Sequence, residues 1–150
     1  MRVLVIAENV TERLRAVSAL QLHADAEVTE ADSGEQARQA LLRETGVFDV
    51  VVVDGDLQPR GGFAILYDLR QHATLEGLTP LPSLVLTSRP QDDWLADWAG
   101  ANATMRKPVD PFQLSAKVRE LVGQPAPVYG GAAGTARQEL LARGKDVSGG

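Results

Sequence analysis

The strongest indication of the fold is the segment Phe48–Asp56, FDVVVVDGD. Its four consecutive valines, Val50–Val53, are typical of a β-strand that is buried on both faces. A second apolar run, Leu81–Thr87 (LPSLVLT), has the same character. Strands of this kind belong to parallel sheets with helices on both faces, so strands and helices should alternate around them.

The rest of residues 1–122 shows this alternation. The predicted strands are Arg2–Ala7, Ala26–Ala31 (at a sheet edge), Phe48–Val53, Leu81–Thr87 and Ala101–Arg106. The predicted helices are Thr11–Leu22, a segment opened by Ser33 and Gln36 and stopped by Gly46, Gly62–His72, a short Pro90–Gly100, and Pro111–Val122. Helix starts are indicated by the capping-box pair Asn9 and Glu12 and by Asp110 before Pro111. The sequence therefore predicts an α/β domain with a doubly wound, five-stranded parallel sheet.

The composition indicates where the domain ends and which classes of protein are excluded. Half of the 14 glycines in the 150 residues fall in Gly123–Gly150, which predicts a flexible tail with a short helical pattern over 135–143 (TARQELLAR). A net charge of −5 argues against binding DNA, and no apolar run reaches the roughly 20 residues that cross a membrane. The chain has no cysteine, and its amino terminus lacks the features of a signal peptide. We expect one cytoplasmic domain over residues 1–122.

Polar residues follow the predicted strands at the edge where such sheets bind ligands. Glu8 follows the first strand, Asp54 and Asp56 the third, Thr87 ends the fourth and Lys107 follows the fifth. Glu8 and Asp54 could bind Mg²⁺, and a carboxylate beside that ion can attack a phosphoryl group. Lys107 and Thr87 have the chemistry that stabilises the phosphoryl oxygens. The simpler alternative is a plain ion pair between Asp54 and Lys107.

These residues make the chain resemble the receiver domains of bacterial two-component response regulators. The motifs that match are Glu8, Asp54, Gly62, Thr87-Ser88, Ala99-Gly100-Ala101 and Lys107-Pro108. The resemblance implies the strand order 2-1-3-4-5 and a signalling module, not an enzyme, that accepts phosphate on Asp54 from a histidine kinase or phosphotransfer protein. It also implies Mg²⁺ held by Glu8, Asp54 and the backbone carbonyl of Asp56, phosphoryl contacts from Lys107 and Thr87, and a cis Lys107–Pro108 peptide.

The sequence departs from the family pattern at four places. Asn9 replaces a second acid and could contribute to the metal only through water, which predicts weaker metal binding. Gln58-Pro59 shifts the usual proline by one residue, and Asp56 adds a carboxylate that could compensate for Asn9 or repel phosphate. Thr104 stands where the family carries the aromatic residue of its switch, so the usual route from Thr87 to the fourth-helix surface lacks its aromatic side chain.

The partner surface follows from the same resemblance. Without a DNA-binding module, the domain would signal through the face of the fourth helix, fifth strand and fifth helix. Trp94 and Trp98 lie one turn apart on the fourth helix; we expect one to pack inward beside Leu95, and Trp98 to be the exposed anchor for a partner. Arg106 is expected to point outward. A homodimer through this face is left open.

Two other functions remain open at this point. A pseudo-receiver would fold in the same way but bind partners without phosphorylation, which Asn9 and Thr104 favour and the Asp54, Thr87 and Lys107 set opposes. Asp54 and Asp56 also resemble the Asp-x-Asp motif of haloacid-dehalogenase-type phosphatases. That family carries an acidic pair after the strand that follows the lysine, where this chain has only Asp110.

Overall fold

A computed structural model describes residues 1–43, 47–57 and 61–123. Its elements are β1 (Arg2–Ile6), α1 (Val10–His23), β2 (Glu27–Ala31), α2 (Gly34–Arg43), β3 (Val50–Asp54), α3 (Gly62–Leu75), β4 (Ser83–Thr87), η1 (a 3₁₀ turn, Pro90–Asp92), α4 (Asp93–Ala99), β5 (Ala103–Arg106) and α5 (Pro111–Leu121). All five predicted strands and five predicted helices are present. The predicted tail, its helix over 135–143, the stop at Gly46 and the loop at Gln58-Pro59 lie outside the described residues.

The five strands form one parallel sheet in the order β2-β1-β3-β4-β5, which confirms the predicted fold and strand order. β3 is its central strand, and Val52 is in register with Val5 of β1 on one side and Leu84 of β4 on the other. All five residues of β3 are buried, as the valine run predicts. β2 is an edge strand, also as predicted.

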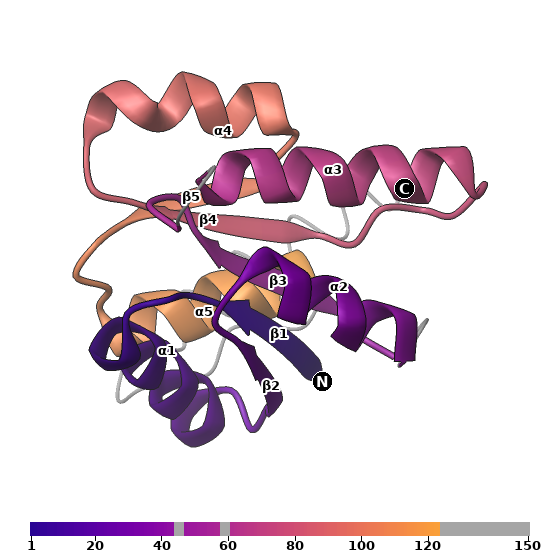
Figure 1. The fold of residues 1–150 in the computed structure, drawn as a ribbon. Helices are drawn as coiled ribbons and strands as arrows, with labels where there is room; N and C mark the ends of the chain where they lie inside the picture. Colours follow the sequence, from indigo (N-terminus) through magenta and orange to yellow (C-terminus); the bar gives the residue numbers. More distant parts are fainter. Residues whose placement is uncertain (44–46, 58–60, 124–150) are drawn as a thin grey trace, which may run out of the picture.

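Helices cover both faces of the sheet (Figure 1). α1 and α5 pack on one face, over Val5 and the other odd-numbered residues of β1. α2, α3 and α4 cover the other face, over Leu4 and Ile6. Because side chains alternate along a strand, the sheet separates two hydrophobic cores, one for each layer of helices.

The predicted helix starts have the expected hydrogen bonds. Asn9 Oδ1 accepts from Glu12 N at 2.9 Å, and Asp110 Oδ1 accepts from Gln113 N at 2.9 Å. The fourth helix differs from the prediction, because Pro90–Asp92 forms a 3₁₀ turn and the α-helix is only seven residues long. It ends at Gly100, which has φ +82°, a conformation that favours glycine.

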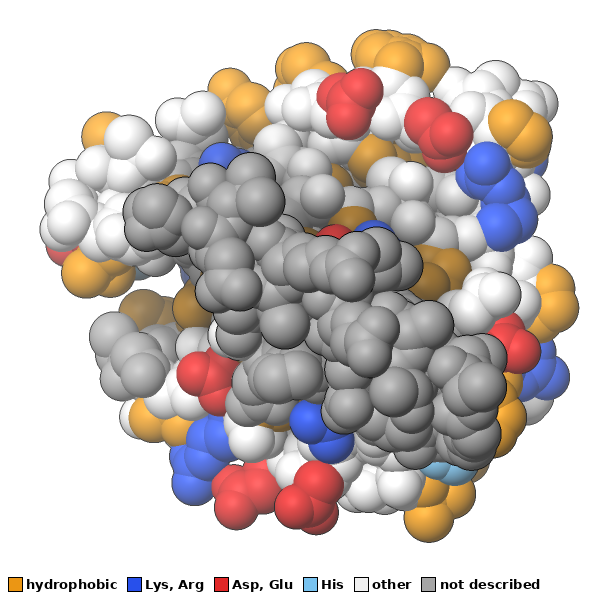
Figure 2. All heavy atoms as spheres, turned by 180° about the vertical axis from the view of Figure 1, so that it is seen from behind, with side chains coloured by type: hydrophobic (Ala, Val, Ile, Leu, Met, Phe, Trp, Pro, Cys, Tyr) orange, Lys and Arg blue, Asp and Glu red, His pale blue; other side chains and the backbone are white. Residues whose placement is uncertain are grey.

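Acidic and hydrophobic side chains are interspersed over the α3–α4 layer, at the top of Figure 2. Both tryptophans of α4 are exposed, Trp94 by 65% and Trp98 by 53%. The prediction that one of them packs into the core is therefore wrong, because the short helix uses Ala96 and Ala99 as its buried contacts. Trp98 instead stacks on Tyr67 of α3, with ring centroids 4.5 Å apart.

Across the part of the chain that the structure describes, no helix combines the length and the apolar character that a membrane span requires.

Candidate functional site

The predicted site residues come together at the carboxyl edge of the sheet. Asp54 and Thr87 are the last residues of β3 and β4, and Lys107 follows the last residue of β5. Since the strands are parallel and adjacent, their ends bring these three side chains to one edge without any special loop conformation.

Asp54 and Lys107 form the centre of the site. Lys107 Nζ lies 2.8 Å from Asp54 Oδ1, and the side chains of Lys107 and Asp54 are only 10% and 5% exposed, respectively. The same Asp54 oxygen accepts a 3.0 Å hydrogen bond from the backbone N–H of Asp56. The carboxylate is therefore held in one orientation by two donors.

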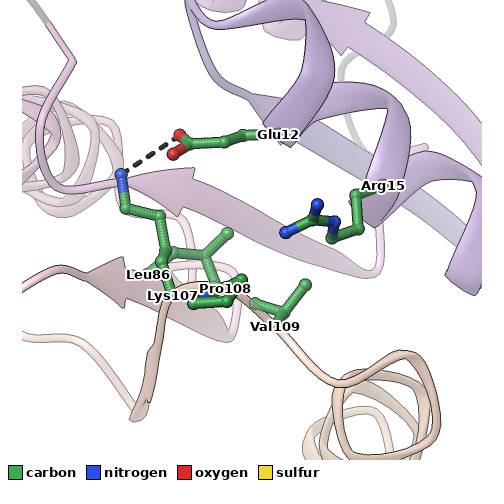
Figure 3. A pocket seen from close by; sticks show the side chains of 6 residues that line it. All are labelled: Glu12, Arg15, Leu86, Lys107, Pro108 and Val109. Carbon is green, nitrogen blue, oxygen red and sulfur yellow. Dashed lines mark hydrogen bonds and ion pairs between the residues drawn. The ribbon is translucent and has the colours of Figure 1, made fainter.

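The Lys107 ammonium also contacts two further carboxylates. Asp56 Oδ2 lies at 2.9 Å and Glu12 Oε2 at 3.1 Å, the latter reaching across from the first turn of α1 (Figure 3). An ammonium has three N–H donors, so one carboxylate can accept each of them. Partial burial alone would lower the pKa of Lys107, but the hydrogen bonds to Asp54, Asp56 and Glu12 outweigh it and raise that pKa above its ordinary value.

Glu12 is a site residue that the sequence pattern does not reveal. Its capping-box position predicts a side chain folded back to the start of its own helix. Only half of that box forms: the Glu12 N–H donates to Asn9, while the carboxylate extends to Lys107. The available signal is that α1 begins at the edge where β1 ends, so its first turn faces the same site.

Asp56 contributes its side chain as well as its backbone to this edge. Its carboxylate accepts a hydrogen bond from Ser88 Oγ in addition to its contact with Lys107. Partial burial tends to raise the pKa of Asp56, yet the hydrogen bonds from Ser88 and Lys107 prevail and lower it. The Asp56 carboxylate thus accepts from both the Lys107 ammonium and the Ser88 hydroxyl.

The Thr87 hydroxyl is oriented by Arg106, a second site residue that the sequence pattern does not reveal. Thr87 is 1% exposed, and its Oγ1 accepts a hydrogen bond from Arg106 Nη1. Arg106 is in register with Thr87 on the neighbouring strand, which explains the contact. Its side chain is 41% exposed, as expected for an outward residue, but it also lies 3.3 Å from Asp93 Oδ1, a contact that the sequence pattern does not predict.

Two of the residues predicted to bind a metal, Glu8 and Asn9, are more exposed than Asp54. Glu8 and Asn9 follow β1 and are exposed, and the side-chain oxygen of Asn9 caps α1. Among residues 1–43, 47–57 and 61–123, no three His, Cys, Asp or Glu side chains are grouped as ligands for one ion. A metal at this edge would need backbone carbonyl and water oxygens to complete its shell, which Mg²⁺ accepts.

Gly62 packs directly against the backbone of Asp54. A Cβ atom at this position would lie 2.0 Å from the backbone oxygen of Asp54 and 2.9 Å from Val53 Cγ2. The Gly62 N–H donates to Gly55 O at 3.0 Å. Only glycine lets α3 begin this close to the end of β3. The Lys107–Pro108 peptide, on the opposite side of the site, is cis as the resemblance implies.

The strand order and this edge define a flavodoxin-like α/β domain. Within that class, the chain belongs to the response regulator receiver domains, whose family model matches residues 3–119. The "uncharacterized response regulatory protein" of two Mycobacterium tuberculosis strains is 36% identical over 129 residues, which cover 84% of this chain and 94% of the relative.

Solved structures agree with this assignment. A response regulator from Chloroflexus aurantiacus is 26% identical with a TM-score of 0.72, over 82% of this chain and 98% of that one. The receiver domain of Ssk1, crystallised with the histidine phosphotransfer protein Ypd1 of Saccharomyces cerevisiae, is 23% identical with a TM-score of 0.73, over 85% and 92% of the two chains. Receiver domains are signalling modules, so the phosphatase interpretation of Asp54 and Asp56 is not retained.

Proposed function

We propose that this domain accepts a phosphoryl group on Asp54 from a histidine kinase or phosphotransfer protein in the cytoplasm and passes the signal on by protein contact. The observation that carries the proposal is the buried Asp54 carboxylate, held 2.8 Å from the Lys107 ammonium at the carboxyl edge of the sheet. Membership of the receiver family supports the same role.

The chemistry assigned to each residue follows from this arrangement. A carboxylate oxygen of Asp54 forms a bond to phosphorus while the bond from phosphorus to the donor's histidine nitrogen breaks, and that nitrogen keeps the electron pair. The Lys107 ammonium is placed to stabilise charge on the phosphoryl oxygens. The Thr87 hydroxyl, at the end of the adjacent strand, would donate a hydrogen bond to the same group.

Mg²⁺ is part of the proposal, with Glu8, Asp54 and the backbone carbonyl of Asp56 as its ligands and Asn9 contributing only through water. The donor chemistry fits, because these ligands offer only oxygen atoms and three carboxylates around Lys107 leave the edge negatively charged. When bound, the ion would neutralise charge on the phosphoryl oxygens. Because Asn9 supplies no charge and already caps α1, we expect weak metal binding.

The partners are proposed from a related complex and from the surface. The Ssk1 receiver domain, which shares this fold, is bound to a phosphotransfer protein in its crystal structure. For output we propose the face of α4, β5 and α5, extended by the exposed Trp98 on the α3 side of α4. A homodimer through this face is a further expectation, which sedimentation of the phosphorylated and unphosphorylated chain would check.

Intact-mass spectrometry tests the acceptor role. The chain is incubated with Mg²⁺ and a small phosphoramidate, next to Asp54→Asn and to a sample with excess chelator. We expect one phosphate adduct on the wild type only, and none with chelator. An adduct of equal yield on Asp54→Asn would contradict the proposal.

One observation favours a second function, a binding module independent of phosphorylation. Asp54, Asp56 and Glu12 together provide one acceptor for each N–H donor of Lys107, so the closed site is stable without a phosphoryl group. In that case the folded wild type would carry no adduct, and Mg²⁺ would leave its tryptophan fluorescence unchanged.

A further inference from the structure

Arg106 bridges the site and the outer helix layer. One guanidinium nitrogen, Nη1, donates to the Thr87 hydroxyl and lies 3.3 Å from Asp93 Oδ1, at the first residue of α4. Asp93 directly precedes the exposed Trp94. A single side chain thus connects the predicted phosphoryl contact with the start of a helix on the molecular surface.

The two contacts of Arg106 differ in strength. Thr87 is buried in the sheet edge, whereas the Arg106 and Asp93 side chains are 41% and 51% exposed. Solvent screens an exposed ion pair, and Asp93 sits on a short helix with few buried residues. A shift of Thr87 would therefore pull Arg106 with it, and the contact with Asp93 would break first.

A comparison with Thr104, on the same strand, shows why Arg106 is the residue that connects Thr87 with α4. Thr104 and Arg106 are two residues apart on β5 and lie on the same side of the strand, outside the layer that Ala103 and Met105 help to fill. Thr104 is exposed, and its side chain is much shorter than that of Arg106. Among the described residues, Arg106 is hydrogen-bonded both to Thr87 and to α4.

We propose that Arg106 transmits the state of Thr87 to α4. This inference rests on the proposed function. When the Thr87 hydroxyl donates to a phosphoryl oxygen on Asp54, its lone pairs still accept from Arg106. Arg106 follows Thr87 toward the added negative charge, the contact with Asp93 is lost, and α4 with Trp94 is released to rearrange.

The test uses Trp94 as the reporter. In a Trp98→Phe background, Trp94 fluorescence is recorded before and after phosphorylation with Mg²⁺ and phosphoramidate, and samples are compared at equal phosphorylated fraction by intact mass. The variants are Arg106→Ala and Asp93→Asn. Arg38→Ala is the control, because it also removes an arginine from an exposed ion pair, in this case with Glu35 on α2.

We expect phosphorylation to change Trp94 fluorescence in the background chain and in Arg38→Ala, and we expect loss of that change in Arg106→Ala and Asp93→Asn. A phosphorylated Arg106→Ala chain that keeps the full change would overturn the relay while leaving the acceptor role intact. Absence of any adduct on the background chain would overturn the proposed function and the relay with it.

Discussion

Lys107 holds the site together, because its ammonium binds one carboxylate from each of three segments. Asp54 ends a central strand, Asp56 belongs to the loop after it, and Glu12 comes from α1. The sequence predicts where Asp54, Thr87 and Lys107 lie, since the strand ends fix where these side chains begin. It does not predict Glu12 or Arg106, because the direction of a long side chain depends on neighbours that only the folded chain supplies.

Asp56→Asn tests whether the Asp56 carboxylate competes with phosphate. The amide removes the negative charge beside Lys107, so both Lys107 and Ser88 become available to a phosphoryl group. Because Asp56 is 47% exposed, its ion pair is worth up to about 1 kcal/mol, which corresponds to a rate increase of up to about 5-fold. The rate of adduct formation by intact mass measures this.

The control for that prediction is Asp25→Asn, which makes the same charge change in the loop between α1 and β2, at the opposite edge of the sheet. Its rate should equal that of the wild type. Slower phosphorylation of Asp56→Asn would show that the carboxylate assists the reaction, for example by replacing the charge missing at Asn9.

Among the elements, α3 and α4 show where sequence patterns succeed and fail. The start of α3 at Gly62 is predicted correctly, because only glycine permits its contact with the Asp54 carbonyl. The short helix predicted over Pro90–Gly100 is present and is closed by Gly100, but its first turn is 3₁₀ and the α-helix begins only at Asp93. Proline at the first position is compatible with a 3₁₀ turn and with an α-helix, so the sequence pattern alone could not distinguish the two.

Gly62→Ala should destabilise the domain and disturb Asp54. The added Cβ meets backbone at 2.0 Å and cannot be accommodated by a side-chain rotation. Overpacking of this kind costs about 1–3 kcal/mol in the free energy of unfolding. Urea denaturation measures the loss, and intact mass should show reduced phosphorylation in the folded fraction.

Gly77→Ala separates crowding from backbone strain. Gly77 has φ +71°, and a Cβ atom added there would have no atom within 4 Å, so its substitution adds strain without crowding. We expect a loss of about 1 kcal/mol and normal phosphorylation. Equal phosphorylation of the Gly62 and Gly77 variants would contradict the role given to Gly62.

For the whole molecule, the doubly wound sheet is the feature best predicted from sequence, because the buried valine run and the regular alternation of elements leave few other topologies. The surface is less predictable. The sequence places Trp98 on the face of α4, β5 and α5, but its described ring contact is with Tyr67 of α3. The direction in which a tryptophan of this seven-residue helix points depends on the rotation of the helix about its own axis. The buried Ala96 and Ala99 determine that rotation.

The charge cluster at the sheet edge makes stability depend on pH. The pKa of Asp56 is lowered by folding, so its contribution to the free energy of unfolding is complete above its unfolded value of 3.8 and is lost as pH falls through the lower folded value. Urea denaturation from about pH 5 to about pH 3 should therefore show decreasing stability at the acidic end. Asp56→Asn should show a shallower decrease, and an identical slope would refute the assignment.

The separation of two hydrophobic cores by the sheet has an evolutionary consequence. The α1–α5 layer supports Glu12 and the segment of Lys107, whereas the α2–α4 layer carries the exposed tryptophans. Substitutions more than about 7–10 Å apart usually have additive effects on stability. Descendants of this chain can therefore vary the part of the recognition surface that lies on α4 with little effect on the packing of the α1–α5 layer, which supports Glu12 and Lys107.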